Sequence, residues 1–175
     1  MGHPLPPLTV RDAAPGEADA IREVTLAAYE QYAAHLPPPF WEAYRDNIVR
    51  TVAKPGAAAQ MVAQRGGAVV GAVLLYPADA ALFAAGKGPP PMRWPEVRLL
   101  AVPPSARGLG VGEALMRACV ARARRAGADR LALHTTPMMA AAVRLYTRMG
   151  FARAPELDFS PVPGFDVHGY TLALG

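Results

Sequence analysis

The stretch EVRLLAVPPSARGLGVGEALMRACVARARRA, residues 96–126, decides the fold predicted for this chain of 175 residues. It begins with a dense apolar run through residue 102, whose composition favours a strand. Pro103 and Pro104 end that strand, because proline has no N–H to give to a sheet. Glycines follow at 108, 110 and 112. Apolar residues then recur every three or four positions over 113–126, which predicts an amphipathic helix.

The predicted arrangement can bind an anion, because a strand is followed by a glycine-rich turn and by the start of a helix. The first turn of a helix has unpaired N–H groups and a favourable dipole, and glycine lets a phosphate approach the backbone. A P-loop is excluded because no lysine follows the glycines, and a dinucleotide fingerprint is excluded because Glu113 stands where its third glycine belongs. The alternative is a plain tight turn, but three glycines opened by Arg107 exceed what a turn needs. We therefore expect a phosphate-bearing ligand here.

Periodicity and turn residues predict the other elements of the chain. Helices are expected over 17–34, 40–53, 113–126 and 138–149, the last with Thr136 as N-cap and Pro137 as first helical residue. Strands are expected over 8–11, 60–64, 68–76, 94–102, 130–135, 151–153 and 166–174. The segments 77–92 and 155–164 are expected to be loops. This order predicts a mixed α/β sheet with helices on both faces.

Composition narrows the class of protein. The length predicts one domain over residues 1–175, with 1–7 as a flexible lead. The net charge of +4 is modest, and the arginine-rich usage points to a GC-rich genome rather than to nucleic-acid binding. The single Cys119 is expected to be buried and to pack as a small hydrophobic residue. One cysteine allows no disulfide framework, which fits a reducing compartment. No signal peptide, membrane span or metal-ligand spacing is found, which predicts a soluble cytoplasmic protein without a metal.

Three side chains outside the glycine turn could carry chemistry. Tyr146 lies on a predicted helix and is either a core tyrosine or a proton donor. Glu96 begins the central strand and is either an exposed carboxylate or a general base. His134 ends the next strand and either caps it or shares that proton transfer, since histidine exchanges protons near neutral pH.

These residues resemble a known family. The chain is similar to the GNAT superfamily of acyl-CoA-dependent N-acetyltransferases, best over residues 94–155. The resemblance is carried by the strand at 96–102, by Arg107-x-x-Gly110-x-Gly112 and by Leu145-Tyr146-x-x-x-Gly150-Phe151. It implies a mixed, mostly antiparallel twisted sheet of six to seven strands, with a splay between the two central strands. It also implies a bacterial acyltransferase that uses acetyl-CoA as co-substrate and no metal.

The resemblance further assigns roles to positions. The Leu100 N–H would polarise the thioester carbonyl, and Tyr146 would protonate the departing thiolate. Either Glu96, as general base, or a water chain would deprotonate the acceptor amine. One departure is Met139, which stands where the family often has an asparagine that touches the pantetheine. The positions implied to contact the cofactor are Leu100, Ala101, Val102, Arg107, Gly108, Leu109, Gly110, Val111, Gly112, Met139 and Tyr146.

The acceptor is expected to be the primary amine of a small or amino-acid-like molecule. In the family, acceptor pockets come from the segments that match 25–45, 77–93 and the C-terminal strands, which here are aromatic and weakly charged. Their aromatic and imidazole residues are Tyr29, Tyr32, His35, Phe40, Trp41, Tyr44, Phe83, Trp94, Phe159 and Phe165. A protein or peptide acetyltransferase and a non-catalytic acyl-CoA sensor remain alternatives. No nucleic-acid or membrane partner is expected, and a homodimer is compatible with the resemblance.

Overall fold

The computed structural model describes residues 5–80 and 91–175, which form two compact units. The first unit comprises residues 5–74 and 99–118, and the second comprises the described parts of 75–98 and 119–175. The hydrogen-bonded strand order is β1-β2-β3-β4-β5-β8-β6, and β7 pairs with β8 off this path. The expected mixed, mostly antiparallel sheet is therefore confirmed, with eight strands instead of six or seven. The prediction of a single domain stays a prediction.

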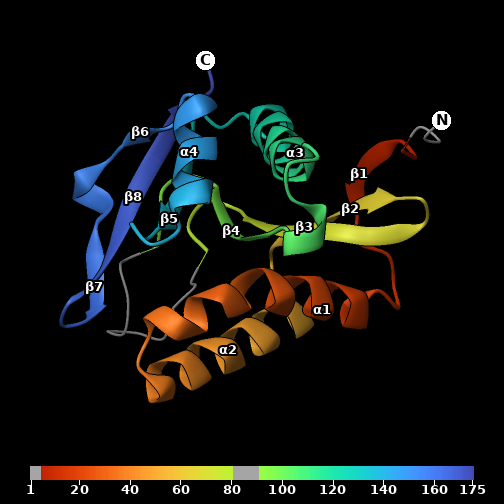
Figure 1. Ribbon diagram of the computed structural model, residues 1–175. Helices are drawn as coiled ribbons and strands as arrows, with labels where there is room; N and C mark the ends of the chain where they lie inside the picture. The colour runs from red at the N-terminus through yellow and green to blue at the C-terminus, as the bar shows by residue number, and fades with distance from the viewer. Residues whose placement is uncertain (1–4, 81–90) are drawn as a thin grey trace. The chain divides into compact units, whose positions relative to one another are not determined.

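The first unit packs two helices on paired strands. Its elements are β1 (Leu8–Asp12), α1 (Ala18–Tyr29), the 3₁₀ helix η1 (Glu30–His35), α2 (Pro38–Ala53), β2 (Ala59–Arg65) and most of β3 (Ala68–Tyr76). β1 and β2 are antiparallel, and α1 and α2, orange in Figure 1, run side by side. Their shared core is an apolar cluster of Ile21, Val52, Val62 and Ala72. On β3, Ala72 faces this cluster, whereas Gly71 faces α3 (Val111–Arg125).

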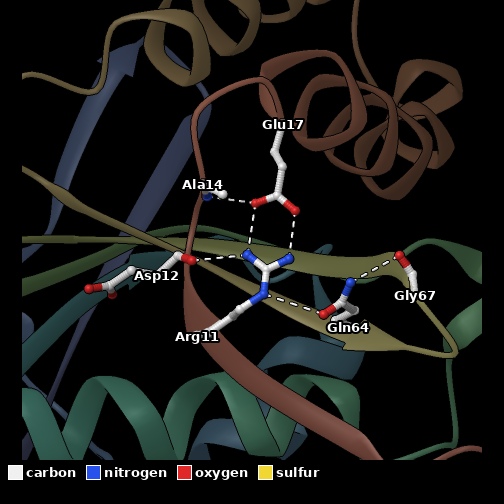
Figure 2. A network of polar contacts seen from close by, with 6 residues as sticks. All are labelled: Arg11, Asp12, Ala14, Glu17, Gln64 and Gly67. Carbon is white, nitrogen blue, oxygen red and sulfur yellow. Dashed lines mark hydrogen bonds and ion pairs between the residues drawn. The ribbon is translucent and has the colours of Figure 1, made fainter.

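A polar network ties β1 to the start of α1 (Figure 2). The Arg11 guanidinium donates to both carboxylate oxygens of Glu17, at 2.9 and 2.6 Å, and its Nε donates to Gln64 at 3.3 Å. Glu17 also accepts the N–H of Ala14 at 2.6 Å, so it closes the turn before the helix. The Arg11 hydrogen bond, followed by the Ala14 N–H, lowers the pKa of Glu17 to about 2.

The second unit is built on an antiparallel pair of strands and the strands that flank it. β5 (Arg130–Thr135) lies parallel to the start of β4 (Glu96–Ala101) through Glu96↔Ala132 and Val97↔Leu133, and antiparallel to β8 (Phe165–Ala173). β6 (Ala152–Arg153) and β7 (Phe159–Val162) pair with β8, beside which β7 lies in Figure 1. The unit also holds α4 (Ala140–Arg148), η3 (Pro155–Leu157) and the second half of α3. Cys119 there is buried, as expected, and burial raises the pKa of its thiol to about 12.

Several predicted elements differ from the structure for local reasons. The helix expected over 17–34 changes to 3₁₀ at Glu30 and ends before the prolines, where Leu36 is extended because a proline follows it. Pro38 and Pro39 begin α2 instead of only ending the preceding helix. Thr136 is not the N-cap of α4, because its hydroxyl has no partner and Met139 precedes the helix. The supposed loop 155–164 contains η3 and β7.

Candidate functional site

The glycine loop has the backbone that an anion site needs. After β4 and the short η2 (Pro104–Ala106), Gly108 and Gly110 have φ angles of +72° and +78°. Side chains rarely adopt these angles, so glycine is required at both positions. A Cβ built on either glycine would meet no atom within 4 Å. The loop therefore leaves open space beside its main chain, which fits the approach of a phosphate group.

The helix that follows the loop starts earlier than predicted, at Val111. The Ala114 N–H donates to the Gly110 carbonyl at 3.0 Å, which closes the first turn around Val111 and Gly112. Val111 is buried, and it can lie there because β3 has Gly71 beneath it. A Cβ on Gly71 would come within 2.7 Å of Val111 Cγ1 and 3.0 Å of the Ala101 carbonyl. The end of the helix that would face an anion is thus fixed by core packing.

The side chain of Arg107 acts as a brace within the first unit. Its guanidinium donates to the Val102 carbonyl at 3.2 Å, to the Gln31 amide oxygen at 3.1 Å and to the Ala28 carbonyl at 3.3 Å. Arg107 therefore joins the loop to the end of α1 and to η1. Its expected role in binding, through a main-chain N–H, does not depend on this side chain.

Leu99 has a backbone conformation that the sequence does not reveal. Its φ is +48°, which is rare for a bulky residue and costs free energy. This kink precedes Leu100 in a strand whose composition is otherwise ordinary. The Leu100 carbonyl accepts the Tyr29 hydroxyl at 3.4 Å. The strand position assigned to the thioester is thus kinked and tied to helix α1, while the predicted splay between β4 and β5 stays a prediction.

Four of the expected acceptor residues form an aromatic cluster in the first unit. Tyr29 contacts Tyr32 and Tyr44 edge to face at 6.0 and 6.1 Å between ring centroids, and Trp41 contacts Tyr44 at 6.2 Å. Burial raises the pKa of Tyr32, so its hydroxyl stays neutral. The cluster comes from α1, η1 and α2 and presents no charged side chain of its own.

Three of the remaining acceptor candidates, Trp94, Phe159 and Phe165, lie in the second unit. Trp94 lies in the second unit, where the Arg93 and Arg130 guanidiniums are 4.5 and 5.7 Å from its ring. Phe159 packs against His134 in the same unit, at 5.3 Å between centroids. Phe83 lies outside the described residues. His35 is exposed, and Phe40 and Phe165 are half-buried.

Glu96 and His134 meet in the second unit. His134 Nδ1 is 2.8 Å from Glu96 Oε1, and the two side chains are 11% and 6% exposed. The reading of Glu96 as an exposed carboxylate is therefore wrong. His134 Nε2 is 2.9 Å from the Leu157 carbonyl, so the ring contacts a residue from a segment expected to be a loop. Sequence reasoning named both residues but gave no sign that they touch.

Tyr146 and Met139 are both buried in the second unit. The Tyr146 ring lies 5.9 Å from that of Phe151, in the turn where α4 ends. Met139 Sδ accepts the Thr135 hydroxyl at 3.6 Å, so this residue is engaged at the end of β5. These contacts fit either interpretation of Tyr146, and its role as proton donor stays a prediction.

The structure thus groups the candidate residues within two regions. Leu100, Ala101, Val102 and the 107–112 loop lie in the first unit, and Glu96, His134, Met139 and Tyr146 lie in the second. Over the described ranges 5–80 and 91–175, no three His, Cys, Asp or Glu side chains are placed to hold a metal ion. No described helix is long and apolar enough to cross a membrane.

Comparisons with known proteins identify the family. The family model described as Acetyltransferase (GNAT) family matches residues 18–151. Mycothiol acetyltransferases of Sanguibacter keddieii and Cellulomonas flavigena are 34% and 33% identical over 86% and 96% of the chain. The chain spans about half of these relatives, 46% and 48% of their lengths.

A solved structure supports the fold. A GNAT family acetyltransferase from Brucella melitensis in complex with acetyl-CoA has a TM-score of 0.64 and 24% identity, covering 97% of this chain and 89% of that one. The residues matched by the family model include the glycine loop and the helix that follows it. The chain belongs to the GNAT family of acetyltransferases.

Proposed function

We propose that the protein transfers an acetyl group from acetyl-CoA to the primary amine of a small or amino-acid-like acceptor by direct attack. The assignment of acetyl-CoA as donor rests on the loop at 107–112. This loop has two glycines with left-handed backbone and open space beside both, and the helix that follows it starts at the buried Val111. Main-chain N–H groups of such a loop would hold the pyrophosphate. Structural relatives crystallised with acetyl-CoA or CoA support the same donor.

The choice of acceptor rests on the aromatic cluster. Its tyrosine and tryptophan rings are neutral and pack on one another, and Tyr29 links them to Leu100, where the thioester is expected. A surface of this kind favours an apolar or aromatic amine over a polycationic peptide, which would need acidic side chains. The name of the two relatives above refers to mycothiol and to no protein, which supports a small-molecule acceptor.

The chemistry assigned to the residues follows from acyl transfer. The acceptor ammonium loses a proton, with Glu96 as base, and the amine nitrogen forms a bond to the thioester carbon. The Leu100 N–H would stabilise the oxyanion of the tetrahedral intermediate. The carbon–sulfur bond then breaks, and Tyr146 gives its proton to the thiolate. Positioning by the loop supplies part of the rate by making the attack effectively intramolecular.

The test is release of free CoA thiol from acetyl-CoA with panels of amines, amino acids and peptides. Turnover with small amines is the expected result, and mass spectrometry should find the product one acetyl group heavier on nitrogen. Turnover confined to peptides would favour the protein acetyltransferase. Tight binding of acetyl-CoA without thiol release across the panels would contradict the enzymatic proposal and favour the sensor.

A further inference from the structure

The contacts of the His134 ring determine how many protons it carries. Nδ1 lies 2.8 Å from Glu96 Oε1, and Nε2 lies 2.9 Å from the Leu157 carbonyl oxygen. Both ring nitrogens therefore meet an oxygen at hydrogen-bonding distance. Both side chains are almost fully buried, so water does not readily replace either partner.

A proton count follows from these partners. A carbonyl oxygen can only accept, so the Leu157 contact requires a hydrogen on Nε2. An ionised carboxylate can also only accept, so the Glu96 contact requires a hydrogen on Nδ1 or a protonated Glu96. A neutral imidazole has only one N–H. Beside an ionised Glu96, its other nitrogen would direct a lone pair at a lone pair of the oxygen that it contacts. Burial makes such an unsatisfied contact costly.

We propose that Glu96 and His134 hold one shared proton at neutral pH, and that His134 is a positioning residue for Glu96. The pair is then either imidazolium with carboxylate or imidazole with carboxylic acid, and it has no net charge. His134 is accordingly not a free neutral base in the resting protein.

The segment that presents the Leu157 carbonyl is clamped in place. Gly169 pairs with His134 across β5 and β8, and a Cβ on Gly169 would collide with Leu157 Cβ. Asp158 accepts the Gly169 N–H at 2.8 Å and forms an ion pair with Arg153 at 2.7 Å. The absent side chain and the ion pair hold η3 against the strand, so the ring cannot lose its Leu157 partner by a small loop movement.

Titratable and aromatic groups lie on both sides of the Glu96–His134 pair. On the Glu96 side, burial raises the pKa of Tyr76, the charge of Arg98 lowers it and the charge of Glu96 raises it, so Tyr76 lies within electrostatic range of both residues. On the His134 side, the ring of Phe159 packs edge to face against the imidazole, at an interplanar angle of 80°. Arg153 and Asp158, the residue after Leu157, form an ion pair, and Glu156 and His168 lie within electrostatic range of that pair. The first two neutralise each other.

This proton has a consequence for acetyl transfer, which rests on the function proposed above. A pair that already holds its proton cannot take another from the acceptor ammonium. It must first release that proton to solvent, after which the ammonium N–H bond breaks and the pair regains a proton.

The proton is tested directly by ¹⁵N-edited NMR of the histidine ring nitrogens in the full chain at neutral pH, with assignment by His134→Gln. We expect bonded hydrogens on both nitrogens, or a single proton exchanging between Nδ1 and Glu96. In Glu96→Gln we expect a hydrogen on Nε2 alone, because the glutamine amide can donate to Nδ1. A wild-type His134 with one N–H and no proton on Glu96 would overturn the proposal, whether or not the protein transfers acetyl groups.

The positioning role is tested by two variants that each keep half of the contacts. The amide nitrogen of Asn in His134→Asn falls near Nδ1 and can still donate to Glu96, whereas that of Gln in His134→Gln falls near Nε2 and can still reach Leu157. The kcat should be retained better in His134→Asn than in His134→Gln, with KM for acetyl-CoA unchanged. Equal kcat in both variants would contradict positioning.

Discussion

In the first unit the groups assigned to acetyl-CoA belong to the main chain, whereas in the second unit the groups assigned to proton transfer are side chains. The loop at 107–112 depends on glycine conformation and on a helix start. The Glu96–His134 pair depends on two parallel strands in register and on a carbonyl from a distant segment. The first arrangement is local in sequence, and the second joins residues 38 and 23 positions apart.

Because of this difference, we expect the two regions to respond to different substitutions. A main-chain site is damaged by strain, bulk or charge placed on the loop, and few side chains in it are individually essential. A side-chain site is damaged by removing a single functional group. Substitutions in the first region should lower the affinity for acetyl-CoA. Substitutions in the second region should lower turnover or change where the shared proton lies.

The largest effect is expected from Tyr146→Phe in the second unit. Removing a general acid lowers kcat by about 10²–10⁴-fold, while acetyl-CoA should bind as before because the loop is untouched. Thiol release at saturating acetyl-CoA measures the first quantity, and calorimetry measures the second. Tyr170→Phe, which removes the hydroxyl of another buried tyrosine of the same unit, is the control and should keep kcat. Equal activity of the two variants would show that Tyr146 is a core residue and not the general acid.

The next effect is expected from Gly110→Asp in the first unit. A carboxylate within about 4 Å of a phosphate costs about 1–4 kcal/mol, depending on how much water screens it. Affinity for CoA in calorimetry should therefore fall by about tenfold or more. Gly127→Asp is the matched control, since Gly127 also has a positive φ, +76°, and open space around it, but ends α3. If both variants bound CoA like the wild type, the loop would not be the phosphate site.

How much could be predicted from the sequence also depends on whether a feature is local in the chain or joins distant residues. The strand, loop and helix at 96–126 could be predicted because proline, glycine and helical periodicity act within a few residues. The kink at Leu99 could not, since no residue there favours a positive φ. Nor could the Leu157 contact, because β7 and η3 look like a polar, proline-bearing loop until β8 supplies their partner. The buried setting of Glu96 likewise depends on strand pairing and not on its neighbours in sequence.

A smaller effect is expected from alanine at two crowded glycines, one in each unit. Gly71→Ala would press on Val111 and Ala101, and Gly169→Ala on Leu157 and the Ala154 carbonyl. Overpacking of this kind destabilises by about 1–3 kcal/mol, which chemical denaturation can measure for both.

The two alanine variants should differ in function. Gly71→Ala displaces the first turn of α3 and should weaken CoA binding, with the His134 ring spectrum unchanged. Gly169→Ala moves Leu157 and should change that spectrum, with CoA affinity retained. The same functional loss in both variants would mean that the division between main-chain and side-chain regions does not hold.

The smallest effect is expected at the network of Figure 2, where Glu17 holds β1 to α1 without a role in either site. The pKa of Glu17 is lowered from 4.5 to about 2, so its folded state prefers the ionised form. The stability it contributes is present above about pH 4.5 and is lost as pH falls toward 2. The difference in unfolding midpoint between wild type and Glu17→Gln should therefore be seen at pH 6 and vanish near pH 2. Asp158→Asn, which weakens the ion pair behind Leu157, provides the contrast: it should alter the His134 ring spectrum, whereas Glu17→Gln should not. A midpoint difference that stayed constant from pH 6 to pH 2 would show that Glu17 acts through packing and not through its charge.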